Sequence, residues 1–234
     1  MKIFAISDLH LSTTGEKPMD VFGGVWTNYV EKIKQDWSDK VSDDDIVLIS
    51  GDISWAMKLE DAIVDLDEIK DLKGKKVMIR GNHDYWWKSL SKIRSALPSG
   101  FFVLQNDAIK IEKTVICGTR GWTCEGSPDF GKEDKKLYLR EAERLRLALI
   151  NAQKVREYGD KLIVMIHFPP FNVRRENSLF TELFESFNVD AVVYGHLHGK
   201  DSRADRKLTK NGIDYYLTSC DQVDFKLTEI ELGE

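Results

Sequence analysis

The chain has 234 residues, 42% of them hydrophobic, which suits one ordinary α/β domain with a sizeable core, and we expect a single domain over residues 1–234. Its 34 Lys and Arg against 39 Asp and Glu give a formal net charge of -5, so extended nucleic acid is not expected as a partner. Three cysteines without CxxC spacing speak against a disulfide framework or a thiolate zinc site, and we expect reduced thiols.

The chain begins with a short apolar run at residues 3–6, which is followed by Asp8 and His10. The run has the composition of a buried strand, and it is too short for a signal-peptide core or a membrane span. We therefore expect a cytoplasmic protein without membrane association.

The same arrangement of a short apolar run that ends in a polar motif recurs four more times. The runs cover residues 46–49, 77–79, 163–166 and 191–194, and they end in Ser50-Gly51-Asp52, Arg80-Gly81-Asn82, His167 and Gly195-His196. Near-continuous apolar runs are typical of strands that are buried on both faces in a sheet covered by helices. Because such sheets collect ligands at the carboxyl ends of their strands, we expect the five motifs to meet at one edge.

The segments between and after these runs show other periodicities. Apolar residues recur at helical spacing over 59–69 and 139–152, which predicts covering helices. Alternation over 213–217 and 225–232 predicts further strands, and Asn211-Gly212 is a hairpin turn signal. The charged stretch from Cys124 to Lys136 contains Gly126-Ser127-Pro128, which predicts a surface loop. If this loop folds over the strand ends, it shapes the entrance to a site formed there.

All five histidines of the chain lie in the polar motifs. Histidine is the commonest metal ligand, and the motifs together supply oxygen and imidazole donors but no thiolate. These donors are Asp8, His10, Asp52, Asn82, His167, His196 and His198. The set suits Mn²⁺, Fe²⁺ or Zn²⁺, and seven ligands suit two ions that share a carboxylate better than one ion with open positions.

The motifs DxH, GD, GNH followed by an acid, a lone His and GHxH occur in this order over residues 8–198. This pattern resembles a calcineurin-like metallophosphoesterase. The resemblance implies an α/β fold, a four-layer α/β/β/α sandwich of two mixed β-sheets flanked by helices. It also implies metal-dependent hydrolysis of a phosphomonoester or phosphodiester by a hydroxide that two metal ions activate.

The resemblance further implies a role for each motif residue. Asp8, His10 and His198 would bind the first metal, Asn82, His167 and His196 the second, and Asp52 both. His83 would donate a proton to the leaving group, and Asp84 would orient or charge-stabilise its imidazole. The glycines before three of these residues, Gly51, Gly81 and Gly195, are expected where the backbone turns sharply or approaches another loop.

Residues outside the motifs give weaker indications about the substrate. Arg120, Arg174 and Arg175 could bind its phosphate oxygens, although ordinary surface arginine is the commoner case. Five aromatic residues could form a wall against a nucleobase or aryl group, but core packing is favoured: Trp55, Tyr85, Trp86, Trp87 and Trp122.

Three functions are compatible with the sequence. The first is a phosphatase or phosphodiesterase that acts on a small phosphoester, for which a nucleotide is one candidate. The second is a nuclease of the same chemistry, and the third is a non-catalytic metal-binding scaffold. The stretch Gly51-Asp52-Ile53-Ser54-Trp55 departs from the Asp-Arg-Gly sequence that commonly follows GD in protein phosphatases, so a phosphoprotein substrate is not expected.

Overall fold

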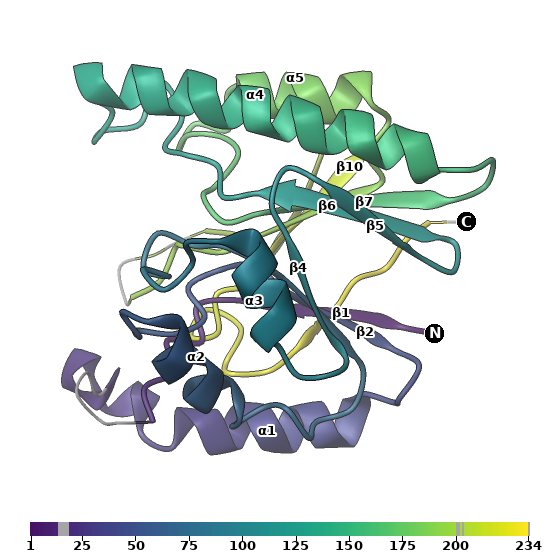
Figure 1. Ribbon diagram of the computed structural model, residues 1–234. Coiled ribbons are helices and arrows are strands. Elements are labelled where there is room, and N and C mark those ends of the chain that lie inside the picture. Colours follow the sequence, from purple (N-terminus) through teal and green to yellow (C-terminus); the bar gives the residue numbers. More distant parts are fainter. Residues whose placement is uncertain (14–18, 200–201, 203, 234) are drawn as a thin grey trace.

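The computed structural model describes residues 1–13, 19–199, 202 and 204–233. Two mixed β-sheets lie face to face, and helices cover the outer face of each sheet (Figure 1). The described residues thus form a four-layer α/β/β/α sandwich, which confirms the predicted fold class.

The first sheet has five strands in the order β11-β1-β2-β3-β4. They are β11 (Thr228–Glu229), β1 (Ile3–Ile6), β2 (Ile46–Ile49), β3 (Lys75–Ile79) and β4 (Phe101–Leu104). All neighbours pair in parallel except β11, which lies antiparallel to β1. The carboxyl ends of β1, β2 and β3 therefore lie at the same edge.

The second sheet has six strands in the order β5-β6-β7-β8-β10-β9. They are β5 (Ala108–Ile111), β6 (Thr114–Thr119), β7 (Lys161–Ile166), β8 (Ala191–Tyr194), β10 (Ile213–Leu217) and β9 (Lys207–Lys210). The central four strands are parallel, and the two edge strands are antiparallel.

In the part of the chain that the structure describes, five α-helices form the outer layers. The first sheet is covered by α1 (Tyr29–Lys40), α2 (Leu59–Leu66) and α3 (Leu90–Ala96), and the second by α4 (Lys132–Val155) and α5 (Leu179–Ser186) (Figure 1). Two 3₁₀ helices, η1 (Met19–Phe22) and η2 (Gly24–Trp26), precede α1.

The continuous apolar runs have a simple explanation in this architecture. In β2, Val47 and Ile49 pack against the helices, whereas Ile46 and Leu48 pack against the second sheet. Because both faces of β2 are covered, every position of this strand is apolar. The five predicted strands and the Asn211-Gly212 hairpin between β9 and β10 are confirmed.

Three predicted elements differ from the structure. The predicted strand over 225–232 is reduced to β11, because Asp224 and Phe225 both have a φ of 57° and Phe225 packs into the core. The predicted loop to Lys136 ends earlier, because α4 begins at Lys132, where the Asp134 carboxylate accepts the Gly131 N–H at 2.8 Å. The helix predicted over 59–69 ends at Leu66.

Two further predictions concern the cysteines and the membrane. All three cysteines are free and buried, which confirms the expectation of reduced thiols. In the described part of the chain, no helix combines the length and the apolar character that a membrane span requires. The single domain over 1–234 stays a prediction.

Candidate metal centre

The five polar motifs meet at one edge of the sandwich, as predicted. They follow β1, β2, β3, β7 and β8, and hydrogen bonds join the loops of the two sheets at this edge. The Ser7 N–H donates to the Thr218 carbonyl at 2.8 Å, and the His196 N–H donates to the Asp8 carboxylate at 3.0 Å. These hydrogen bonds hold in contact residues that lie 188 positions apart in the sequence, as His196 and Asp8 do, or further apart.

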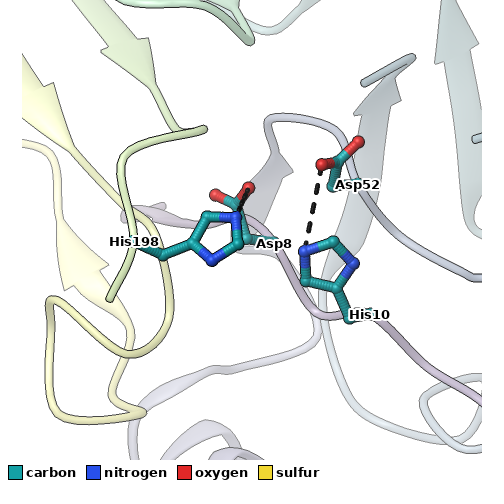
Figure 2. Close-up of side chains that lie close together, drawn as sticks. All are labelled: Asp8, His10, Asp52 and His198. Atoms are coloured by element: carbon teal, nitrogen blue, oxygen red, sulfur yellow. Dashed lines mark ion pairs between the residues drawn. The ribbon is translucent and has the colours of Figure 1, made fainter. Parts of the chain in front are cut away.

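Four of the predicted ligands form a compact cluster. Their ligand atoms all lie within 4.8 Å of one another (Figure 2), and the residues are Asp8, His10, Asp52 and His198. His10 Nε2 is 3.9 Å from Asp52 Oδ2, and His198 Nε2 is 4.0 Å from Asp8 Oδ1. These separations are too long for hydrogen bonds but suit atoms that bind a common cation.

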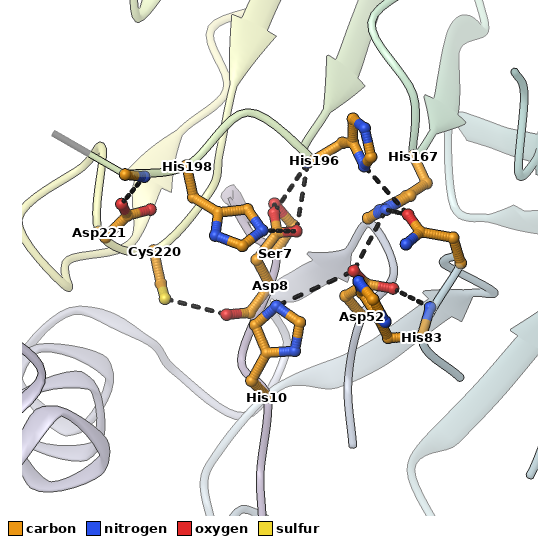
Figure 3. A network of polar contacts seen from close by, with 12 residues as sticks. Ser7, Asp8, His10, Asp52, His83, His167, His196, His198, Cys220 and Asp221 are labelled. Atoms are coloured by element: carbon orange, nitrogen blue, oxygen red, sulfur yellow. Dashed lines mark hydrogen bonds and ion pairs between the residues drawn. The ribbon is translucent and has the colours of Figure 1, made fainter. Parts of the chain in front are cut away.

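A second group adjoins the first through Asp52. The side-chain oxygen of Asn82 lies 2.8 Å from His167 Nε2 and 3.0 Å from His196 Nδ1. His167 Nε2 is in turn 3.5 Å from Asp52 Oδ2, so this carboxylate lies between the two groups (Figure 3). The structure therefore brings all seven candidate ligands together, and their division between two metal ions stays a prediction.

Several of these residues adopt a backbone conformation that is rare for residues with a Cβ. The φ angles are positive for Asp8 (57°), His10 (46°), Asp52 (50°) and His196 (71°). Such left-handed conformations are unfavourable and persist only where surrounding contacts hold them. Here the N–H groups of Asp8 and His10 donate to the carbonyls of Gly51 and Asp52, both at 3.0 Å.

The glycines of the motifs allow the loops to approach one another, as predicted. A Cβ on Gly51, whose φ is 94°, would lie 2.7 Å from both the Gly81 nitrogen and His167 Nδ1. A Cβ on Gly81 would overlap Asp52, and one on Gly195 would lie 2.5 Å from Asp8 Oδ2. Any larger residue at these positions would push the metal-ligand loops apart.

Burial and charge set the protonation of the cluster. Burial lowers the pKa of His10 to about 4 and, together with His167, lowers the pKa of His196 to about 4. Burial opposes the ionisation of Asp52 and His167, but their mutual attraction outweighs it. The pKa of Asp52 therefore lies well below its usual value, and the pKa of His167 rises to about 9.

The donor atoms of the cluster fit a divalent metal ion. Among the described residues, both ring nitrogens of His10 and Asp52 Oδ2 are buried and have no hydrogen-bond partner. Leaving such a group unpaired costs about 1–3 kcal/mol, so donors of this kind are expected where they bind an ion. The carboxylate, amide and imidazole donors suit Mn²⁺, Fe²⁺ or Zn²⁺.

The family described as calcineurin-like phosphoesterase matches residues 1–200. The chain belongs to this family. The family is metal-dependent and hydrolyses phosphoesters, which agrees with the buried Asp and His cluster. The comparison with curated proteins gives no match.

Solved structures share the fold of this chain at low sequence identity. TT1561 of Thermus thermophilus has a TM-score of 0.60 at 11% identity, covering 99% of this chain and 98% of that one. A phosphopantetheinyl hydrolase from Mycobacterium tuberculosis has a TM-score of 0.58 at 13% identity, covering 98% and 95%. The Aquifex aeolicus protein of unknown function AQ665 has a TM-score of 0.53 at 15% identity, covering 97% and 95%.

His83 lies at the rim of the cluster of candidate ligands. Its backbone N–H donates to Asp52 Oδ1 at 2.7 Å, and its ring lies 5.7 Å from the ring of His10 and 4.6 Å from that of Trp55. Its Nδ1 is buried without a hydrogen-bond partner among the described residues, and burial lowers the pKa of the imidazole.

Asp84 makes different contacts from those expected. Its carboxylate accepts the N–H groups of Ile53 at 2.9 Å, Ser54 at 3.2 Å and Gly81 at 2.7 Å, and the Trp86 indole N–H at 3.1 Å. Within the described chain it has no hydrogen bond or ion pair with His83. Burial and the nearby Asp52 raise its pKa to about 6. Asp84 thus joins the loops after β2 and β3, in place of the expected contact with the imidazole.

Each of the three candidate arginines pairs with a carboxylate. Arg120 lies 3.4 Å from the buried Glu141 and stacks over the Trp122 ring at 4.6 Å. Arg174 pairs with Glu176 at 3.0 Å, and Arg175 pairs with Asp205. Of the three, Arg175 lines the cavity beside the histidines. Substrate binding by these arginines stays a prediction.

Four of the five aromatic residues pack in or against the core. Trp86 and Trp87 are buried in it, and the half-buried Trp55 and Trp122 pack against it, which confirms the favoured interpretation for these four. Trp55 stacks on the His10 ring at 4.6 Å, and Trp122 packs against Phe168 at 5.0 Å. Tyr85 is 41% exposed.

Several residues that support the ligands were not predicted. Ser7 donates its hydroxyl to Asp8 Oδ2 at 2.6 Å, and Cys220 donates its thiol to the Asp8 carbonyl at 3.1 Å (Figure 3). Asp65 of α2 is buried and accepts the Ser54 hydroxyl at 2.5 Å. Ser7 could have been identified by its position next to Asp8, whereas Cys220 and Asp65 carry no signal in the sequence.

Beside His196 and His198 lies a cavity of about 610 Å³. Its walls come from the loops after β6, β7 and β8 and from β9. Cys124, Ser127, Pro128 and Asp129 are among the lining residues, so the charged segment after Cys124 does border the site, as expected.

Proposed function

We propose that this chain hydrolyses a small phosphomonoester or phosphodiester at a centre of two divalent metal ions. The observation that carries the proposal is the position of Asp52 between two groups of donors. Asp8, His10 and His198 would hold one ion, Asn82, His167 and His196 the other, and Asp52 both. The ions, when bound, would polarise the phosphoryl oxygens and lower the pKa of the attacking water.

The protein's own residues would position the ester and manage its protons. His83 would donate a proton to the leaving oxygen, because its ring lies beside the donor cluster, 5.7 Å from the ring of His10. Asp84 would act as a positioning residue, since it fixes the loop that carries His83 against the loop that carries Asp52.

The experiment that tests the proposal starts from metal-stripped protein to which Mn²⁺, Zn²⁺ or Fe²⁺ is restored. Chromogenic mono- and diesters are assayed beside the variant His83→Ala, with the exposed neighbour variant Lys88→Ala as a control. We expect metal-dependent turnover that falls about 10²–10⁴-fold in His83→Ala but not in Lys88→Ala. Metal analysis should show that His83→Ala retains two ions per chain.

The leaving group makes this test sharper. A nitrophenolate leaves without protonation more readily than a phenolate or an alkoxide does, so the loss in His83→Ala should be greater for phenyl than for nitrophenyl esters. An equal loss for both esters would contradict the role of His83 as a proton donor.

The two alternative functions are outcomes of the same work. Two bound metals without turnover of any phosphoester would favour a scaffold. Salt-sensitive retention of DNA in a gel shift, together with its cleavage, would favour a nuclease.

A further inference from the structure

The cavity beside the metal ligands has predominantly apolar walls. Its lining includes Phe168, Phe171, Val173, Tyr194, Leu197 and Leu208. Phe168 packs its ring against the His196 imidazole at a centroid distance of 4.1 Å. The apolar surface therefore begins directly at a proposed metal ligand.

The charges that the described residues bring to the cavity do not favour a polyanion. Apart from the histidines, the charged residues among the described lining are Asp129, Arg175 and Asp205. Arg175 forms an ion pair with Asp205, so its positive charge is already balanced. The remaining carboxylate would repel additional phosphate groups, which a nucleotide polyphosphate would bring.

The mouth of the cavity also exposes apolar surface. Val173 is 79% exposed, whereas Phe168 and Tyr194 on the inner wall are 5% and 1% exposed. At about 610 Å³, the cavity is in the size range of pockets that enclose most of a drug-sized molecule. An occupant could therefore place one end at His196 and His198 and cover Val173 with the other.

We propose that this cavity binds an apolar organic group that is esterified to the phosphate. The substrate is then a phosphoester of a large, mostly uncharged and apolar alcohol rather than a nucleotide polyphosphate. This inference rests on the proposed function, because it assigns the phosphoryl group to the adjacent metal ligands.

The test compares 4-nitrophenyl phosphodiesters whose second ester group is methyl, hexyl or the 5′-oxygen of thymidine. The nitrophenolate leaving group is the same in all three, so differences in kcat/KM report the second group. Each buried methylene contributes a factor of about four. We expect the hexyl ester to exceed the methyl ester by about tenfold or more, and to exceed the thymidine ester.

Variants at the exposed valine connect this preference to the cavity. Val173→Asp should lower the hexyl-to-methyl ratio about fivefold or more, because it places a charge where the chain would lie. Val173→Leu should maintain or raise the ratio. Val21→Asp, at a valine that is 72% exposed outside the cavity, should leave both rates unchanged.

The outcomes separate this inference from the proposed function. Metal-dependent turnover with equal rates for methyl and hexyl esters, or with a preference for thymidine, overturns the inference and leaves the function standing. If no ester is hydrolysed, the function fails, and calorimetry with hexylphosphonate and methylphosphonate decides the inference. If hexylphosphonate binds more tightly than methylphosphonate and Val173→Asp weakens this binding, the result supports an apolar group in the cavity. Equal binding of the two phosphonates would overturn the inference.

Discussion

The two sheets contribute differently to the common edge. On the first sheet, Asp8, His10 and Asp52 are completely buried, and hydrogen bonds connect their loops on several sides. On the second sheet, the side chain of His198 is 31% exposed, and the cavity opens beside His196. Both sheets would hold the metal ions, since His167 of the second sheet is also completely buried, and we expect the loops of the second sheet that line the cavity to select the substrate.

Backbone hydrogen bonds between the loops after β1 and β2 continue the pairing of these two strands beyond their ends. The backbone N–H of His10 donates to the Asp52 carbonyl at 3.0 Å, and that of Leu11 to the Ile53 carbonyl at 2.9 Å. The backbone N–H of Trp55 donates to the Leu11 carbonyl at 3.1 Å. Such buried backbone bonds leave the ligands little freedom, and substitutions here should affect both stability and metal binding. Substitutions in the cavity loops should change the preference among substrates.

The largest expected effect is that of Asp52→Asn, which keeps the size of the side chain but removes the charge between the two donor groups. Phosphoesterase activity should fall on the order of a thousandfold or more, equivalent to about 4 kcal/mol of transition-state stabilisation. The bound metal should fall below two ions per chain in elemental analysis. Asp214→Asn on β10 is the control, and full activity of Asp52→Asn with both metals bound would refute the bridging role.

Gly51→Ala should disturb the packing of the loops after β2, β3 and β7 without removing a candidate ligand. The added Cβ would meet the Gly81 nitrogen and His167 at 2.7 Å, at a φ of 94° that alanine adopts with difficulty. We expect a loss of about 1–3 kcal/mol in the free energy of unfolding, together with a loss of metal. Gly100→Ala, at a similar φ of 85° but with nothing within 4 Å, separates the backbone strain from the steric contact.

Asp84→Asn tests the connection between the loops after β2 and β3. All four groups that contact this carboxylate are N–H donors, so an amide NH₂ would face a donor on at least one side. Urea denaturation should show a loss of about 1–3 kcal/mol, and the exposed variant Asp43→Asn should show none. Unchanged stability would mean that the carboxylate does not brace the two loops.

The smallest effect is expected for Arg174→Ala. Its guanidinium is exposed and paired with Glu176, and it does not line the cavity in the described residues. Activity and melting temperature should both stay unchanged, because exposed ion pairs contribute little. A clear increase in KM for a phosphodiester would instead restore the predicted substrate contact.

The sequence alone predicted β1, β2, β3, β7, β8 and β10, though not β6, and placed the candidate ligands at the ends of five of these strands. This was possible because strands covered on both faces leave continuous apolar runs, and because the polar residues that follow parallel strands meet at one edge. The spacing of Tyr29, Ile33 and Trp37 carries a helical signal for α1, but this helix and the shorter α3 and α5 were not among the predicted elements.

Only the tertiary structure determined what surrounds those ligands. Asp84 accepts hydrogen bonds from residues about 30 positions away in the sequence. Asp65, an acidic residue of the predicted covering helix over 59–69, is buried. Arg175 pairs with Asp205 across 30 positions, so the charge of the cavity cannot be read from either residue alone. Local sequence patterns record which faces of an element are covered, but the partner of each polar group depends on which loops the fold brings together.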